Sequence, residues 1–365
     1  MISVAANTQQ QLKDIIRAAF DAAREAGEIP DSPPAEFTVE VPADTAKGDF
    51  ATNAAMVNAR TFRMAPQKLA AILAARMDLS ALPVDRCQVA GPGFINFFVT
   101  PGWYVDQVKD ILEKGPDYGR SSYGGGQKVM VEFVSANPTG PMHMGNARGG
   151  AIGDVLAAAL DWSGHDTIRE FYVNDAGNQI EKFGKSLSAR YRQLFLGEEA
   201  VEFPEDGYHG EDIRDHAKAY AEAHGDSLMA LAEEERKAAL VAYALPKNIE
   251  ALKRDLSTYR INFDVWFLES QLHPNAINAV IQKLEEKGAI YRQDGAVWYK
   301  ATGFGGEKDE VLVRQNGIPT YFAADIAYHY NKFAVRGYQR VINIWGADHH
   351  GHVARLKGAM DAIGL

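Results

Sequence analysis

Three residues, His143, Gly145 and Asn146, stand close enough together in the chain to act on one ligand. The imidazole and the primary amide can each donate a hydrogen bond to a phosphate oxygen, although the amide carries no charge. An Ala-rich segment follows, and the N-terminus of a helix offers free N–H groups and about half a positive charge. The spacing therefore predicts a site that holds phosphate groups where a helix begins.

A strand and a helix are predicted on either side of these residues. β-Branched and aromatic residues crowd positions 129–134 and indicate a buried strand, which ends at a Pro/Gly-rich turn at 137–140. Apolar residues between 152 and 160 recur at helical spacing. The glycines of this segment carry no side chain, so a nucleotide and the preceding strand can approach the backbone closely.

Three long stretches of the chain resemble one family. The run HMGN, with NPTG before it and GGAIGD after it, is similar to the HIGH signature of class I aminoacyl-tRNA synthetases. The stretches VEFVSANPTGP, YVNDAGNQI and WGADHHGH resemble, in this order, bacterial-type arginyl-tRNA synthetases. Asn146 stands where the signature more often has a second His, so this position can donate a hydrogen bond but cannot carry a charge.

The resemblance implies an α/β fold, with a doubly wound parallel sheet of Rossmann type as the catalytic domain. A second strand is predicted at 167–173, and strand-helix alternation is typical of folds that bind ligands beyond the carboxyl ends of their strands. Asn174 and Asp175 then lie either near the ligand or in an ordinary capping turn. We expect a small N-terminal α/β domain at 1–115, the first half of the catalytic domain at 126–200, an inserted, mainly helical domain at 201–300 and the second catalytic half at 301–365.

On this resemblance, the chain is expected to activate L-arginine with ATP and to pass the arginyl group to tRNA(Arg). Positioning and preorganised donors can do most of this catalysis without an enzyme nucleophile. The expected catalytic residues are His143, Gly145 and Asn146. The expected ATP-binding residues are Pro138, Gly140, His143, Gly145, Asn146, Gly346 and Asp348.

A guanidinium group is a planar fork of donors, which carboxylates match with paired hydrogen bonds and which a lysine ammonium cannot reproduce. By resemblance, Glu269 in FDVWFLESQ would hold this group together with Asp325 and Tyr321, which lie four residues apart. The alternative for Glu269 is an exposed helix cap. The expected arginine-binding set is completed by Glu132, which would order the strand end, and by Ser135, Asn137 and His349, which would face the α-amino or carboxylate end.

A cluster of His349, His350 and His352 beside Asp348 admits a second interpretation as a metal site, because His and Asp at short spacing are common ligands. Arginyl synthetases are not built around a protein-held transition metal. We therefore expect the cluster to face amino acid and ATP, with Mg²⁺ brought in by ATP and no metal held by the protein.

The N-terminal region alternates helices and strands, and in arginyl synthetases the corresponding domain recognises the D-loop of tRNA. On that resemblance, Phe94 and Asn96 are expected to stack on and hydrogen-bond an exposed base, as proteins do with single-stranded loops. The alternative is that Phe94 belongs to the core.

The composition of the 365-residue chain favours a cytoplasmic protein. One cysteine, Cys87, cannot form an intrachain disulfide, and no apolar run is long enough to span a bilayer. The formal net charge of −10 argues against a nucleic-acid partner. However, residues 201–250 hold 12 acidic and 5 basic residues, so the negative charge is concentrated in one segment. We expect a monomer.

A KMSKS-like second phosphate loop and an anticodon-binding domain, which the family carries, are not found in the chain. We therefore expect a truncated protein that binds arginine and ATP but charges tRNA poorly. Two other functions stay open: a nucleotidyltransferase of the HxGH type, and a non-catalytic RNA-binding fragment.

Overall fold

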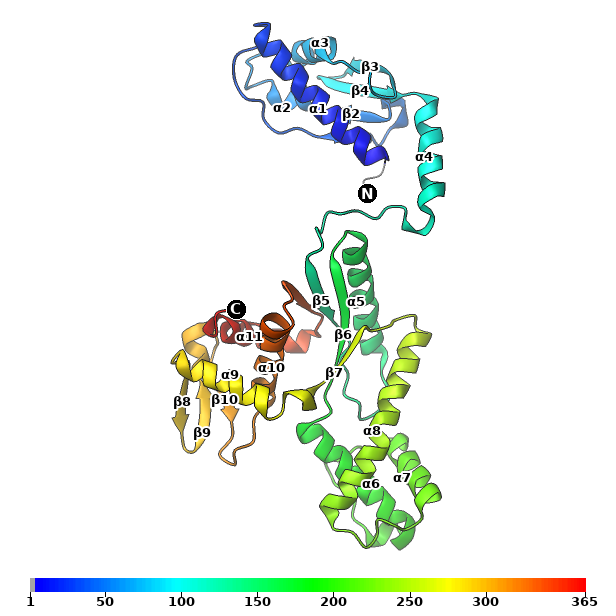
Figure 1. The fold of residues 1–365 in the computed structure, drawn as a ribbon, viewed down its shortest axis with the longest axis vertical. Helices are drawn as coiled ribbons and strands as arrows, with labels where there is room; N and C mark the ends of the chain where they lie inside the picture. Colours follow the sequence, from blue (N-terminus) through cyan, green and yellow to red (C-terminus); the bar gives the residue numbers. More distant parts are fainter. Residues whose placement is uncertain (1–3) are drawn as a thin grey trace. The chain divides into compact units, whose positions relative to one another are not determined.

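The computed structural model describes residues 4–365, apart from the side chains of Val4, Ala5 and Asp348. It divides into two compact units, one that ends at Ser122 and one that covers Tyr123–Leu365 (Figure 1). The N-terminal unit has one core cluster and the second unit has three.

The N-terminal unit is a four-stranded antiparallel sheet with helices, in the order β1-β2-β4-β3. Its core is rich in aromatic residues, and Phe20 stacks on Phe62 with ring centroids 5.5 Å apart. The elements are α1 (Val4–Glu25), β1 (Val39–Glu40), β2 (Phe50–Thr52), α2 (Ala54–Asn58), α3 (Pro66–Arg76), β3 (Val84–Ala90), β4 (Phe94–Val99) and α4 (Pro101–Lys114).

A four-stranded parallel sheet forms the centre of the second unit. Its order is β11-β5-β6-β7, with β5 (Lys128–Glu132), β6 (Asp166–Val173), β7 (Val265–Leu268) and β11 (Arg340–Asn343). The chain builds the sheet outward from β5 to β7 and then returns to the other side of β5 with β11. The strand order therefore reverses between β5 and β11, which is where doubly wound folds bind ligands.

Helix α5 (Met144–Trp162) follows β5 and packs closely against it because two of its glycines face neighbouring side chains. A Cβ at Gly153 would overlap the ring of Phe133, and one at Gly150 would lie 2.8 Å from Ile261. Both glycines are buried. Close approach of the helix to the strand thus fixes the position of the loop that joins them.

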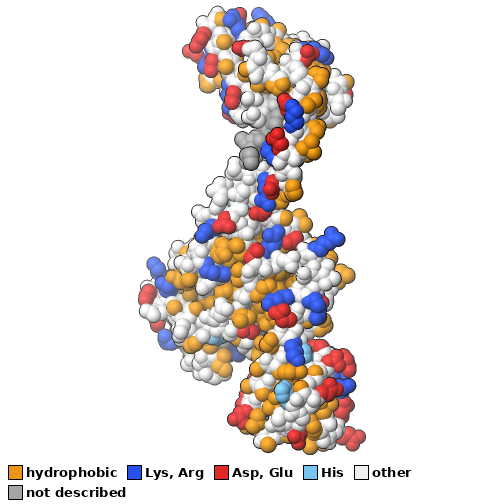
Figure 2. Space-filling view, turned by 45° about the vertical axis from the view of Figure 1, so that its right-hand side comes forward, with side chains coloured by type: hydrophobic (Ala, Val, Ile, Leu, Met, Phe, Trp, Pro, Cys, Tyr) orange, Lys and Arg blue, Asp and Glu red, His pale blue; other side chains and the backbone are white. Residues whose placement is uncertain are grey.

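A helical cluster is formed by α6 (Gly177–Leu196), α7 (Glu211–His224) and α8 (Glu233–Thr258), whose N-terminal half shares a core with the other two helices. Figure 2 shows Asp and Glu side chains gathered at the lower end of the molecule, where Figure 1 places these helices. The acidic residues of 201–250 are thus largely a solvated surface.

The rest of the unit is a second, antiparallel sheet of order β10-β9-β8 covered by helices that share its core. The elements are α9 (Asn275–Glu286), β8 (Ile290–Gln293), β9 (Ala296–Tyr299), β10 (Glu310–Val313), α10 (Tyr321–Tyr330) and α11 (His350–Ala362). A short π-helix (Asn331–Val335) follows α10, and a short 3-10 helix (Ala347–His349) precedes α11.

The doubly wound α/β fold is confirmed, but the range expected as an insertion contributes to the central sheet. Val265–Leu268 lies inside 201–300 and pairs with β6 in parallel as the edge strand. Its short apolar run, VWFL, follows a long polar helix, so the sequence pattern around it resembles that of the insertion. Every helix described in residues 4–365 is too short or too polar to cross a lipid bilayer.

Candidate active site

Polar and aromatic residues follow all four strands of the parallel sheet at the same edge. Glu132 ends β5, Asn174 follows β6, Glu269 follows β7 and Trp345 lies two residues beyond β11. Parallel strands point their carboxyl ends the same way, so these four positions come together although they span more than 200 residues of sequence.

Two cavities open along this edge and meet at Trp345 and His349, which line both. The first, which we call the cation cavity, has a volume of about 660 Å³ and is lined by Glu132, Tyr172, Glu269, Tyr321 and Asp325 among others. The second, the phosphate cavity, has a volume of about 1060 Å³ and is lined by Ser135, Asn137, Gly140, His143, Gly145, Asn146 and Gly346 among others.

In the phosphate cavity, His143 and Asn146 cap the start of α5 reciprocally. The His143 Nδ1 accepts the Gly145 N–H at 3.1 Å, and the Asn146 Oδ1 accepts the His143 N–H at 3.0 Å. An acceptor Nδ1 places the imidazole proton on Nε2, and an acceptor Oδ1 leaves the Asn amide N–H groups as donors. The cap therefore leaves donor atoms, the His143 Nε2–H and the Asn146 amide, for a ligand.

The backbone between β5 and this loop adopts a rare conformation. Val134 and Ser135 have φ values of 67° and 42°, a left-handed region that costs a non-glycine residue about 1–3 kcal/mol. The turn lets the Ser135 Oγ donate to Glu132 at 3.0 Å and accept the Tyr172 N–H at 3.1 Å. These two bonds tie the loop to β5 and β6.

The helical cluster supports the same loop from the other side. The Asn248 Nδ2 donates to the Pro138 carbonyl at 2.9 Å, and the His216 Nε2 donates to the Asn248 Oδ1 at 2.6 Å. Pro138 is buried and is not among the described residues that line either cavity. Its position thus supports the loop, whereas its neighbour Gly140 faces the phosphate cavity.

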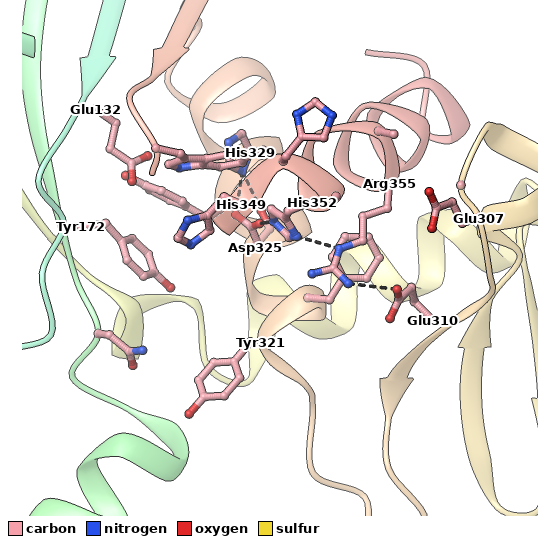
Figure 3. Close-up of a pocket in the computed structure, with 18 of the residues that line it drawn as sticks. Glu132, Tyr172, Glu307, Glu310, Tyr321, Asp325, His329, His349, His352 and Arg355 are labelled. Carbon is pink, nitrogen blue, oxygen red and sulfur yellow. Dashed lines mark hydrogen bonds and ion pairs between the residues drawn. The ribbon is translucent and has the colours of Figure 1, made fainter. Parts of the chain in front are cut away.

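Asp325 lies in the cation cavity between two histidines (Figure 3). The His329 Nδ1 lies 3.0 Å from the Asp325 Oδ1, and the His352 Nε2 hydrogen-bonds the Asp325 Oδ2. Burial acts to raise the pKa of this carboxyl, but His329 and His352 outweigh it and hold the pKa well below its usual range. Asp325 is therefore ionised over the whole neutral range.

Glu269 is the second carboxylate of the cation cavity, and its surroundings act in the opposite direction. It is 3% exposed, and burial raises its pKa although His273, 3.2 Å away, and the Tyr172 hydroxyl both donate to it. In the amide orientation that satisfies both its groups, Asn174 also donates to the Glu269 Oε2 at 2.9 Å. A cationic ligand would compensate the buried charge that the protein leaves partly unbalanced.

Glu132 already has protein partners on both oxygens. Its Oε1 accepts from Ser135, and its Oε2 pairs with Lys332, which is fully buried. Its carboxylate thus orders the end of β5. Asp175 is likewise engaged away from the cavities, because it accepts the Ser270 N–H at 2.8 Å and the Ser270 hydroxyl at 2.6 Å.

The remaining expected residues fall into three groups. Tyr321, 43% exposed, and the exposed His349 line the cation cavity. The side chain of Asp348 lies outside the described part of the structure. Phe94 is half-buried and Asn96 is 6% exposed, and both lie on β4 in the N-terminal unit.

The sequence interpretation missed several residues of the cation cavity. Asn174 was expected either near a ligand or in a capping turn, and these residues were not assigned to the site: Tyr172, Glu310, His329, Trp345 and Arg355. His329 follows Asp325 by four residues on one helix face, and this helical spacing is the signal that was available. The described residues include no group of three or more His, Cys, Asp or Glu side chains suited to a metal ion.

Comparison with known proteins assigns both units. Residues 107–364 match the model of the tRNA synthetases class I (R) catalytic domain, and residues 9–99 match that of the arginyl tRNA synthetase N-terminal domain. An arginine–tRNA ligase from Acetivibrio thermocellus is 55% identical over 366 residues, covering 100% of this chain and 65% of that protein. The chain thus spans a little under two thirds of the curated relatives it matches.

Solved structures that resemble the chain are arginyl-tRNA synthetases as well. A Campylobacter jejuni structure assigned as an arginyl tRNA synthetase superposes with a TM-score of 0.65 at 39% identity, over 71% of this chain and 56% of that one. The Thermus thermophilus arginyl-tRNA synthetase gives a TM-score of 0.60 at 21% identity, over 98% of this chain and 63% of that one, and shows the fold alone. These matches do not fit the HxGH-type nucleotidyltransferase alternative. The chain belongs to the arginyl family of class I tRNA synthetases.

Proposed function

We propose that the chain activates L-arginine with ATP, as the catalytic part of an arginine–tRNA ligase that charges tRNA(Arg). The observation that carries this proposal is the junction of the two cavities at Trp345 and His349. Arginine bound with its guanidinium beside Asp325 would extend its α-carboxylate toward this junction, where the α-phosphate of ATP would lie.

The cation cavity supplies the side-chain specificity. Asp325 and Glu269 would accept paired hydrogen bonds from the guanidinium, and Tyr321 would cover it. Such a site rejects analogues that lack the donors by roughly 10⁴–10⁵-fold. Ser135, Asn137 and His349 would bind the α-amino and carboxylate groups. Glu132 orders the end of β5, after which the loop with Ser135 and Asn137 begins.

The phosphate cavity would bind ATP. His143 and Asn146 would donate to the phosphates as charge spreads in the transition state, beside the N-terminus of α5 and with Mg²⁺ brought in by ATP. Gly145, Gly140 and Gly346 would let the nucleotide approach the backbone. Pro138 would act through the loop, and Asp348 stays part of the proposed ATP set.

The N-terminal unit would bind tRNA. Its match to the family's N-terminal domain supports this role, and Phe94 and Asn96 are the proposed contacts with an exposed base. Both are at least half-buried, so binding would require their side chains to become accessible. We propose that the protein is cytoplasmic, in keeping with the single cysteine, and that it is a monomer.

Calorimetric titration of arginine, citrulline and lysine tests the function. Citrulline matches arginine in shape but is neutral, and lysine keeps the charge but lacks the fork of donors. With a non-hydrolysable ATP analogue present, arginine should bind at least roughly 10²-fold more tightly than either. ATP–pyrophosphate exchange should then depend on arginine. Equal affinities for the three amino acids would contradict the proposal.

A further inference from the structure

Asp325 accepts hydrogen bonds from two imidazoles, so the charge of the cation cavity depends on their protonation. A free imidazole gains its second proton at about pH 6.5. If either His329 or His352 were protonated, it would cancel the charge of Asp325. Asp325 would then add no net attraction for a cation to that of Glu269, which lines the same cavity.

The hydrogen bonds around His352 require a neutral ring. Its Nε2 faces the Asp325 carboxylate and therefore carries the proton. Its Nδ1 accepts the Arg355 Nε–H at 2.7 Å, which requires a lone pair on that nitrogen. A second proton on Nδ1 would face a guanidinium that has no acceptor to offer.

The bonds around His329 lead to the same result with the opposite tautomer. Its Nδ1 faces two acceptors, the Asp325 Oδ1 at 3.0 Å and the Asp325 carbonyl at 2.9 Å. Its Nε2 lies 2.8 Å from the Asn343 Nδ2. The orientation of that amide is set by Lys332, which donates to the Asn343 Oδ1 at 3.1 Å, so the amide nitrogen donates to His329.

The cations behind the histidines each have an anion of their own. Arg355 donates to Glu310 at 2.9 Å, and Lys332 pairs with Glu132 (Figure 3 shows Arg355 between His352 and Glu310). With these pairs balanced, Asp325 keeps an unbalanced negative charge. The other titratable side chains that line the same cavity are Tyr172, Glu269, Glu307, Lys308, Tyr321, Tyr328, His349 and His350.

We propose that Arg355 and Asn343 are positioning residues that fix His352 and His329 as neutral donors of opposite tautomer, so that Asp325 presents its full charge to a guanidinium. The role of that charge in arginine binding rests on the proposed function. The protonation of the two rings does not, because it is a property of the protein without ligand.

Nitrogen NMR of the chain with ¹⁵N-labelled histidine, without arginine, tests the ring states directly. The two signals are assigned by comparison with His329→Asn and His352→Asn. We expect His352 to be protonated on Nε2 alone and His329 on Nδ1 alone at pH 6.0. A doubly protonated ring at either position at pH 6.0, or the reverse pair of tautomers, would overturn the inference.

Arg355→Met tests the effect on the ligand, with Lys357→Met as the matched control. Lys357 is exposed on the same helix and is not among the described lining residues, so its loss changes the net charge equally. In Arg355→Met, the His352 Nδ1 loses the donor that occupies its lone pair, so a second proton can bind there. Arginine affinity should then fall at least roughly tenfold between pH 8.5 and pH 5.5, against about twofold in the control.

Arg355→Lys distinguishes a positioning role from a structural one, because an ammonium can still donate to the His352 Nδ1. It should restore much of the flat pH profile. If Arg355→Met and Lys357→Met show the same pH profile of arginine binding, the inference fails. If no variant binds arginine while the NMR signals match, the proposed function fails and the assigned ring states stand.

Discussion

The phosphate cavity and the cation cavity meet at two residues but are built in different ways. The phosphate cavity takes most of its lining from one segment, residues 134–152, in which backbone N–H groups, glycines and a reciprocal helix cap present the donors. The cation cavity joins side chains from separate segments through hydrogen bonds that are buried or partly buried. Donors for an anion can thus be supplied locally by a helix start, whereas a cation site needs carboxylates that the whole fold must stabilise.

The two carboxylates of the cation cavity sharpen this comparison. His329 and His352 both contact the Asp325 carboxylate and lower its pKa, whereas burial raises the pKa of Glu269. The ionised Asp325 therefore stabilises the protein without a ligand. The ionised Glu269 destabilises it, and a bound cation would offset that destabilisation.

Replacing Asp325 should separate the cavities most sharply. Asp325→Asn removes the charge but keeps the shape, so arginine affinity should fall roughly 30-fold to a few thousand-fold, from the 2–5 kcal/mol of a buried charge pair. ATP affinity should stay within about twofold of the unchanged chain, as expected for a site with other contacts. Calorimetry with each ligand measures both, and an equal loss of the two affinities would show that the cavities are one.

Asp325→Asn also has a pH signature in stability. A carboxyl whose folded pKa is lowered contributes stability that is present above its unfolded pKa and is lost as pH falls through the folded pKa. The unchanged chain should therefore be the more stable of the two at pH 7, with a difference that shrinks in acid. Urea unfolding at several pH values checks this sign.

In the phosphate cavity, His143 both caps α5 and offers a donor, and two substitutions separate these roles. His143→Asn keeps a good cap but removes the imidazole, so ATP–pyrophosphate exchange should slow roughly 10²–10³-fold with little change in stability. His143→Ala should show the same loss of rate and lose about 1 kcal/mol of stability as well. Normal exchange by His143→Asn would mean that the imidazole acts only as a cap.

Glu269→Gln should improve the fold while it weakens arginine binding. Loss of a charged hydrogen bond should lower arginine affinity roughly tenfold or more. Because its folded pKa is raised, Glu269 destabilises the fold as pH rises through that pKa, so the variant should be the more stable of the two at pH 8. Thermal unfolding at pH 8 and pH 5 tests this, and a less stable variant at pH 8 would contradict it.

The smallest effect is expected where the helical cluster supports the phosphate loop. Asn248→Ala leaves the Pro138 carbonyl without its donor, so the chain should lose about 1–3 kcal/mol of stability and bind ATP several-fold less tightly. Asn278→Ala, exposed on α9, is the control. If the two variants bind ATP alike, the helical cluster does not hold the loop.

The phosphate cavity is built mostly from one segment and the cation cavity from several, and this difference explains which of the two could be predicted from the sequence. The strand, loop and helix around His143 lie within about one supersecondary unit, where residue spacing and turn chemistry predict the structure. The contacts of Asp325 join α10 to α11 and, through Asn343, to β11. They depend on packing and strand register, which spacing along the chain does not reveal.

Val265–Leu268 shows the same limit. Its four apolar residues follow a long polar helix, and only pairing with β6 identifies them as the edge of the central sheet. Short apolar runs of this kind do not distinguish a strand from part of a buried helix.

Binding of a non-hydrolysable arginyl-adenylate analogue, such as an arginyl sulfamoyl adenosine, tests most directly whether the two cavities form one site. If a guanidinium beside Asp325 and a phosphate beside His143 belong to one ligand, the analogue should bind at least roughly 10²-fold more tightly than arginine or ATP alone. An affinity no higher than that of the tighter separate ligand would contradict the account.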